Sequence, residues 1–299
     1  MGISHYIKEI GRGKDGARAI DRGQAADLMG QVLDGQVSDL ELGAFCLAMR
    51  IKGETPEEMA GFLDATQARL NKVDTGDAPT VVLPSYNGAR KLPVLTPLLA
   101  LLLAREGVAV VVHGSVTEDR RVPSEAVFSA LGIQPCTDAL SARAGETLFV
   151  HTASLHAGLD RLLSVRRTVG LRNAGHSLVK LMNPIKGSAL VVGSYTHPEY
   201  LQSMSATFAL TGQHALLLRG TEGEPVADAR RTPAMDVFRN GQGRRVQTQR
   251  EGSLEHMPDM PSPEAQATAT YVQQVLRGES AIPEPIALQV QHILNEVMT

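Results

Sequence analysis

Apolar residues recur at intervals of three and four along the first 70 residues, and this spacing predicts amphipathic helices. Three of these helices have recognisable start signals, in which a capping side chain is followed three positions later by Gln or Glu. The signals are Asp21 with Gln24, Ser38 with Glu41, and Thr55 with Glu58. For the second helix, the expected apolar side consists of Leu40, Phe45, Leu47 and Ile51.

The pattern changes after residues 74–79, a polar and turn-rich segment that predicts a hinge. Beyond it, short β-type runs alternate with helical stretches, which predicts a mostly parallel sheet flanked by helices. We therefore expect an α/β fold with a small helical domain at 1–75, serving dimerisation, and a large α/β domain at 80–299. The expected strands are 80–83, 108–113, 147–151, 189–195 and 214–219, and the expected later helices include 95–106, 124–131, 263–277 and 284–298.

Composition excludes several classes of protein. The 299 residues are 43% hydrophobic with a net charge of −3, which suits a globular chain with a sizeable core. Cys46 and Cys136 are the only cysteines, so neither a disulfide scaffold nor a structural zinc site is expected. Such low cysteine content suits a protein of the reducing cytosol. The longest apolar run, 94–104, is too short to span a bilayer, so no membrane partner is expected.

Charge is unevenly distributed along the chain. Residues 155–186 carry six Lys and Arg against one acid, and residues 219–250 carry seven Arg against four acids. The last segment, 251–299, reverses this balance with seven acids against one base. Such asymmetry can mark a basic surface, although scattered solvated charge is the alternative.

Ligands of open α/β sheets bind at the carboxyl ends of the strands. After the first expected strand, Ser85 and Asn87 offer hydrogen bonds, Gly88 allows close backbone approach, and Arg90 and Lys91 supply positive charge. These residue types predict a site for an anion or a phosphate group. An ordinary loop with two solvated bases is the alternative.

Two further groups could carry chemistry. His113 and Gly114 close the next expected strand, where the imidazole could face a pocket or serve a structural role. Arg172, His176 and Lys180 are spaced by four, so in a helix they would line one face. That face would suit a phosphate, or it would be a solvated stripe. The chain has no P-loop, dinucleotide fingerprint, H-E-x-x-H or G-x-S-x-G motif.

The order of these segments resembles the anthranilate phosphoribosyltransferase fold, which pyrimidine nucleoside phosphorylases share. The stretch LDGQVSDLELGAFCLAMRIKGETPEEMAGFLDA is the most specific part, and the resemblance continues through 156–184 and 191–224. It implies a small helical domain, a large α/β domain, a cleft at the hinge, and a homodimer formed mainly through the helical domains.

The family's catalytic motifs are degenerate in this chain. The glycine-rich phosphate loop corresponds to residues 84–89, which contain one Gly; the Asn-x-Ser-Thr motif keeps only Thr96; and the magnesium-binding Asp-Glu pair is replaced by Glu224-Pro225. Arg172 matches the Arg that contacts the aromatic acceptor. The resemblance thus implies a vestigial cleft with no catalytic residue, metal or cofactor. Its residues would be Ser85, Asn87, Gly88, Thr96, His113, Gly114 and His176.

Residues 6–22, 85–91 and 170–181 are similar to a YbiB-like, DNA-binding subfamily of this fold. The resemblance implies a cytoplasmic homodimer, which could associate with the nucleoid, that binds single- and double-stranded DNA or RNA without sequence preference, with a link to the DNA damage response. Tyr86 is the candidate stacking platform. The expected phosphate contacts are Arg90, Lys91, Arg166, Arg167, Arg172 and Lys180, and an early basic cluster of Lys8, Arg12, Lys14, Arg18 and Arg22 could extend them.

Two other functions stay open at this point. A phosphoribosyltransferase or nucleoside phosphorylase with an altered substrate would use the same cleft with Mg²⁺. A small-molecule sensor would bind a ligand there without turnover.

Overall fold

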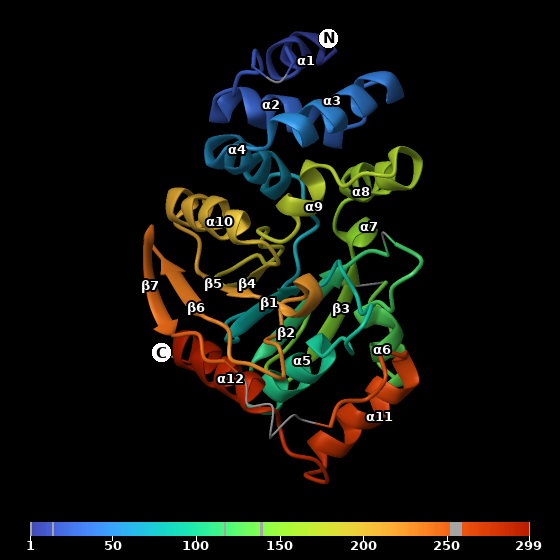
Figure 1. The fold of residues 1–299 in the computed structure, drawn as a ribbon, viewed down its shortest axis with the longest axis vertical. Coiled ribbons are helices and arrows are strands. Elements are labelled where there is room, and N and C mark those ends of the chain that lie inside the picture. Colours follow the sequence, from blue (N-terminus) through green and yellow to red (C-terminus); the bar gives the residue numbers. More distant parts are fainter. Residues whose placement is uncertain (1, 14, 117, 138–139, 252–258, 299) are drawn as a thin grey trace.

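A helical part caps one end of an α/β part in the computed structural model, which describes residues 2–13, 15–116, 118–137, 140–251 and 259–298 (Figure 1). All three predicted helix starts form reciprocal capping boxes, led by Asp21, Ser38 and Thr55. These boxes satisfy backbone N–H groups that the first helical turn leaves without partners. The helices are α1 (Ser4–Ile10), α2 (Arg22–Leu33), α3 (Asp39–Lys52) and α4 (Pro56–Gln67).

The predicted inner side of α3 is wrong except for Phe45. The helix buries the face that carries Leu42, Phe45, Cys46 and Met49. Apolar residues lie on both sides of this helix, so periodicity alone could not choose between them. The other apolar residues, Leu40, Leu47 and Ile51, are 84%, 45% and 65% exposed.

In the described part of the chain, the sheet has seven strands in the order β3-β2-β1-β4-β5-β6-β7, and pairing is parallel from β3 through β5. The predicted fold class is therefore confirmed. The hairpin of β6 and β7 is antiparallel and was not predicted. The strands are β1 (Thr80–Pro84), β2 (Ala109–Gly114), β3 (Thr147–His151), β4 (Leu190–Tyr195), β5 (Ala215–Arg219), β6 (Met235–Arg239) and β7 (Gln242–Gln247).

A recognisable signal does precede β7. Asn240 and Gly241 both have positive φ, at 51° and 80°, as a two-residue hairpin turn requires. The strand QGRRVQ is mostly exposed, because β7 is the edge of the sheet, and so it lacks the apolar alternation used to find the other strands.

Strand residues alternate between two cores, one on each face of the sheet. Val82 and Val111 join the cluster shared with the helical part, α8 and α10, whereas Val81 and Val110 join the cluster that α5, α11 and α12 cover. The helices of this part are α5 (Thr96–Arg105), α6 (Ser124–Ala130), α7 (Thr152–Leu155), α8 (Ala157–Val169), α9 (Ala174–Leu178), α10 (Pro198–Thr211), α11 (Ala265–Leu276) and α12 (Glu284–Val297). No helix in the described ranges could cross a membrane.

Glu58 links separate segments of the helical part from a fully buried position. Its carboxylate accepts hydrogen bonds from the backbone N–H of Ile20 at 3.1 Å and of Thr55 at 2.8 Å, and it pairs with the Lys52 ammonium at 2.6 Å. Removing one partner of a buried ion pair leaves the other charge, and any N–H groups that donated to it, buried without a partner.

We expect Glu58→Ala to lower the free energy of unfolding by about 3 kcal/mol, because three donors lose their acceptor together. The neighbouring Glu57→Ala removes an equal charge from an exposed position of the same helix turn and should cost less than about 1 kcal/mol. Urea denaturation of both variants measures the difference, and equal effects would contradict the assigned role of Glu58.

Candidate functional site

The carboxylate of Glu224 occupies the place where the sequence predicts an anion site. It follows β5 in a short turn, is 1% exposed, and reaches the loop after β1. The backbone N–H groups of Asn87 and Gly88 donate to Oε1 at 2.7 and 2.8 Å. The Thr96 hydroxyl donates to Oε2 at 2.9 Å, and the Ser85 hydroxyl donates to the same oxygen. The structure thus brings together four predicted cleft residues around a protein carboxylate.

A fifth donor completes this set. Ser124 lies at the start of α6, 3.4 Å from Oε2 of Glu224 and 2.7 Å from the Ser85 hydroxyl. We call the donors of Ser85, Asn87, Gly88, Thr96 and Ser124 the anion cradle. Two consecutive backbone N–H groups with several hydroxyls form an arrangement that suits oxyanions. Gly88 has a φ of 70°, a left-handed conformation that glycine adopts without strain.

The turn that carries Glu224 is fastened at several points. Glu222, with a φ of 51°, accepts at its side chain from the backbone N–H of Arg90 at 2.6 Å. The Asn87 amide donates to the Glu222 carbonyl at 2.7 Å. Gly223 approaches so closely that a Cβ there would lie 2.0 Å from Nδ2 of Asn87. A strained backbone such as this turn persists only when the surrounding contacts stabilise it.

Lys180 belongs to those contacts. Its Nζ donates to the Gly223 carbonyl at 2.8 Å, where the Ser194 hydroxyl also donates at 2.8 Å. Burial lowers the pKa of Lys180 to about 8, although the Glu224 carboxylate opposes that shift. Lys180 therefore holds the turn in addition to lining the cleft.

His113 is fully buried beneath this loop. Its Nδ1 is 2.7 Å from the Tyr86 hydroxyl, which is itself 2.9 Å from the Thr152 hydroxyl. Burial lowers the pKa of His113 to about 3, so the imidazole is neutral. Tyr86 is 5% exposed and cannot serve as the predicted stacking platform. A Cβ on Gly114 would lie 2.2 Å from the Ser85 carbonyl, which explains the glycine.

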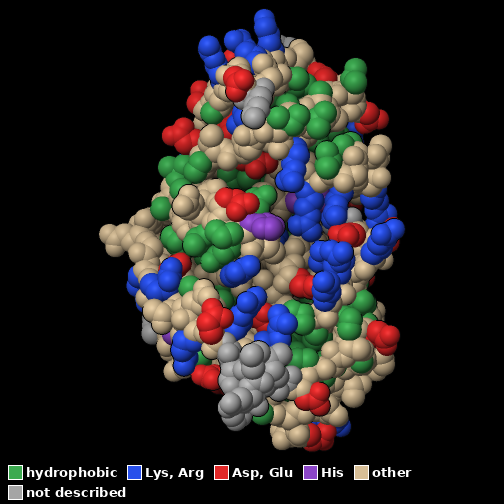
Figure 2. Space-filling view, in the orientation of Figure 1, with side chains coloured by type: hydrophobic (Ala, Val, Ile, Leu, Met, Phe, Trp, Pro, Cys, Tyr) green, Lys and Arg blue, Asp and Glu red, His purple; other side chains and the backbone are tan. Residues whose placement is uncertain are grey.

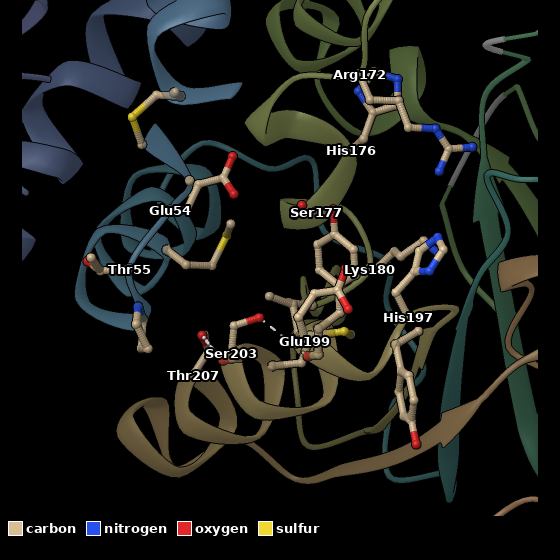
Figure 3. A pocket seen from close by; sticks show the side chains of 18 of the residues that line it. Glu54, Thr55, Arg172, His176, Ser177, Lys180, His197, Glu199, Ser203 and Thr207 are labelled. Carbon is tan, nitrogen blue, oxygen red and sulfur yellow. Dashed lines mark hydrogen bonds between the residues drawn. The ribbon is translucent and has the colours of Figure 1, made fainter. Parts of the chain in front are cut away.

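The predicted helical face of Arg172, His176 and Lys180 is wrong. Helix α8 ends at Val169, Gly170 takes a left-handed conformation, and α9 spans only Ala174–Leu178. Arg172 precedes α9 and Lys180 follows it, yet all three side chains line the same cavity (Figure 3).

That cavity, of about 640 Å³, lies between the helical part and the α/β part. Figure 3 shows Arg172 and His176 at one end, Glu54 on the side of the helical part, and Ser203 and Thr207 on α10. Burial, with the nearby Arg172 charge, lowers the pKa of His176 to about 3. Burial also lowers the pKa of Arg172, and the charges of Arg166 and Arg121 add to this effect.

Basic side chains gather across the middle of the face seen in Figure 2. Arg90 and Lys91 are exposed, and among the described residues neither forms a side-chain ion pair. Arg166 contacts Glu118 at 2.9 Å and is half-buried, while the exposed Arg167 donates to the Val116 carbonyl at 2.9 Å. A smaller hollow, of about 370 Å³, is lined by Lys91, Arg219, Arg230 and Arg231 and also by Glu222 and Asp228.

The early basic cluster lies elsewhere. Lys8 is on α1, at the tip of the helical part and away from the sheet (Figure 1). Arg12 pairs with Glu9 at 2.6 Å and Arg22 with Asp64 at 2.6 Å, whereas Lys14 is outside the described residues. Within one chain, α1 therefore does not extend the basic surface at the cleft.

Comparison with known proteins shows which family this chain belongs to. Residues 4–69 match the glycosyl transferase family, helical bundle domain. The uncharacterized protein YbiB of Escherichia coli (strain K12) is 40% identical over 97% of this chain and 92% of its own. The chain belongs to the YbiB family.

Anthranilate phosphoribosyltransferases are more distant relatives. The enzyme of Anaeromyxobacter dehalogenans (strain 2CP-C) is 27% identical over 96% of this chain and 86% of its own. The solved structure of the Thermus thermophilus enzyme superposes with a TM-score of 0.75 at 21% identity, covering 98% of this chain and 89% of that one. The Saccharomyces cerevisiae enzyme, solved in complex with PRPP and Mg, gives a TM-score of 0.65 at 14% identity, covering 99% of this chain and 86% of that one. These likenesses establish the shared fold.

The acidic residues near the cleft do not fit a magnesium site of that kind. Glu224 is committed to the cradle, and Asp228 pairs with Arg230 at 2.8 Å and with Arg231 at 3.3 Å. Among the described residues, no three His, Cys, Asp or Glu side chains gather as a metal ion would require.

The two buried imidazoles make stability depend on pH. Their pKa values of about 3 lie below the ordinary 6.5, so the unfolded chain takes up protons first, and stability falls as pH decreases below about 6.5. Between pH 7 and pH 5 each should cost about 2 kcal/mol of unfolding free energy. Denaturant titrations at pH 7 and pH 5 measure the free energy of unfolding of the wild type and of His176→Gln, and the variant should show the smaller pH dependence. An identical pH dependence in both proteins would contradict the assigned contribution of His176.

Proposed function

We propose that this protein binds nucleic acid through the phosphate backbone and does not read base sequence. The observation that carries the proposal is the Glu224 carboxylate in the anion cradle. A phosphoribosyl donor requires the cleft to receive phosphate groups, and this chain supplies an acid of its own there. Positive charge remains on the open face beside it, where an extended polyanion has access.

The exposed cations support this function. Arg90 and Lys91 are exposed with no side-chain ion pair among the described residues, and Arg167 is exposed at the end of α8, with Asp119 4.0 Å away. Exposed cations attract phosphates and release counterions on binding. Arg172 and Lys180 are less accessible, so we assign them to the cleft interior.

Contacts limited to phosphates also agree with the aromatic residues. Only 4% of the chain is aromatic, and Tyr86 is buried against His113. Base stacking, the usual means of gripping unpaired bases, therefore has no platform in this loop. We therefore expect binding that depends neither on base sequence nor on whether the nucleic acid is single- or double-stranded. Such binding suits a nucleoid-associated protein of the cytoplasm that takes part in the response to DNA damage.

A second candidate is phosphoribosyl transfer to an altered acceptor. The favouring observations are the 27% identity to anthranilate phosphoribosyltransferase and the cavity lined by Arg172 and His176. This function requires Glu224 to leave the cradle before a donor phosphate enters. It predicts saturable binding of phosphoribosyl pyrophosphate with Mg²⁺. The nucleic-acid proposal makes no such prediction.

Fluorescence anisotropy of a labelled strand of about 40 nucleotides across a salt series tests the proposal. We expect the double variant Arg90→Gln/Lys91→Gln to weaken binding by about tenfold or more and to reduce the salt slope by about 2, because two phosphate contacts are lost. The loss should be similar for all sequences, since no base contact is removed.

The matched control is Lys8→Gln/Arg18→Gln, which removes one exposed charge on α1 and one at Arg18, whose backbone N–H donates to the Glu9 carbonyl of that helix at 3.0 Å. It should leave affinity and salt slope near those of the wild type. Equal effects from both pairs would overturn the assigned surface. Absence of wild-type binding at low salt, together with saturable uptake of phosphoribosyl pyrophosphate and Mg²⁺, would establish the second candidate instead.

The exposed apolar side of α3 supports a homodimer. Leu40, Leu47 and Ile51 lie on the outer side of the helical part. Helix α3 contacts α8, and Leu171, just beyond the end of α8, is 44% exposed. Several large apolar side chains facing water on neighbouring elements are typical of an interaction surface. A second copy of the chain would cover them and place two basic faces in one particle.

Light scattering during gel filtration tests this assembly. The wild type should have twice the 32.0 kDa mass of one chain, and Leu47→Glu/Ile51→Glu should have the single mass, because buried charges oppose association. Leu210→Glu, at an exposed apolar position on α10, is the control and should stay dimeric. A wild-type monomer at micromolar concentration would refute the dimer.

A further inference from the structure

The anion cradle supplies five hydrogen-bond donors, whereas a carboxylate has about four lone-pair sites to receive them. Two backbone N–H groups, from Asn87 and Gly88, converge on Oε1, while the hydroxyls of Thr96, Ser85 and Ser124 surround Oε2. A carboxylate has two oxygens, whereas a phosphate offers three or four around a tetrahedral centre. The donor set therefore matches a tetrahedral oxyanion as well as it matches a carboxylate.

The elements that supply these donors come from far apart in the chain. They are the loop after β1, the first turn of α5 and the first turn of α6, while the acceptor follows β5. Residues 84–96, which supply four of the five donors, contain no acid, and Glu125, which follows the fifth donor Ser124, lies 3.4 Å from His151. Glu224 arrives through a strained turn, with a positive φ at Glu222 and the tight contact of Gly223 with Asn87.

We infer that Glu224 is a built-in occupant of a phosphate-type site, and that the native chain excludes free phosphate from the anion cradle for this reason. The carboxylate holds residues 85–88 in the conformation that a bound phosphate would impose. Lys180 and Ser194 keep it there by fixing the Gly223 carbonyl. This inference goes beyond the proposed function and does not depend on nucleic-acid binding.

Removal of the carboxylate should convert the cradle into a phosphate site. In Glu224→Ala, the buried donors lose their acceptor and the protein loses stability, because buried polar groups without partners are costly. Inorganic phosphate at about 10 mM should then raise the Tm of the variant by about 3 °C in a saturable way, since a ligand that binds only the folded state stabilises it. The wild type at the same ionic strength should show no such rise.

Two controls isolate the cause. Glu224→Gln removes the charge but leaves a side chain in the cradle, so it should lose stability without gaining a response to phosphate. Glu57→Ala removes an equal charge from the exposed surface of α4 and should behave as the wild type does. A Glu224→Ala protein that folds and shows no phosphate response would overturn the inference.

Hydrogen exchange on the wild type gives a test that needs no variant, and so it decides the matter if Glu224→Ala fails to fold. The amides of Asn87 and Gly88 donate to Glu224, so their exchange should be slow and unchanged by phosphate. Phosphate-dependent protection of these amides would show that phosphate replaces the carboxylate in the native chain and would overturn the inference. Rapid exchange of both amides with and without phosphate would overturn it too, because the carboxylate would not be holding them.

Discussion

The buried carboxylate of Glu224 constrains the loop after β1 and the starts of α5 and α6. A charge that is 1% exposed is tolerated only when hydrogen bonds surround it, and the donors of Glu224 come from the loop after β1 and the starts of two helices. Because the carboxylate lies on the segment after β5, these contacts join the chain beyond β5 to the chain beyond β1, across the intervening strand β4. The positions of Asn87, Gly88 and Lys180 all follow from that junction.

Features that depend on neighbours in sequence could be predicted from the sequence. The capping boxes at Asp21, Ser38 and Thr55 are such features, because each joins a residue to another three positions away. The buried parallel strands were predictable for a similar reason, since an uninterrupted apolar run already indicates burial on both faces. The hairpin turn at Asn240 and Gly241 offered an equally local signal that was not used.

The candidate site was predictable only in part. Ser85, Asn87 and Gly88 were identified as an anion-binding loop, but the anion that they bind lies 136 positions beyond Gly88. Neither that contact nor the break between α8 and α9 follows from spacing, because both are fixed by packing between distant segments. The choice of a buried side on α3 failed for the same reason. Periodicity described the apolar positions of that helix but not which of them the rest of the fold would cover.

The arginines of β7 have a consequence for how copies of this chain behave in a crowded solution. This strand is the outermost of the sheet, so its free backbone groups could pair with a strand of another molecule. Arg244 pairs with Glu296 and Arg245 with Asp236, and together they keep charged groups along the exposed edge. An incoming strand would have to desolvate these groups, which opposes uncontrolled extension of the sheet. Part of the basic charge of residues 219–250 therefore protects the protein against aggregation, whatever ligand the cleft receives.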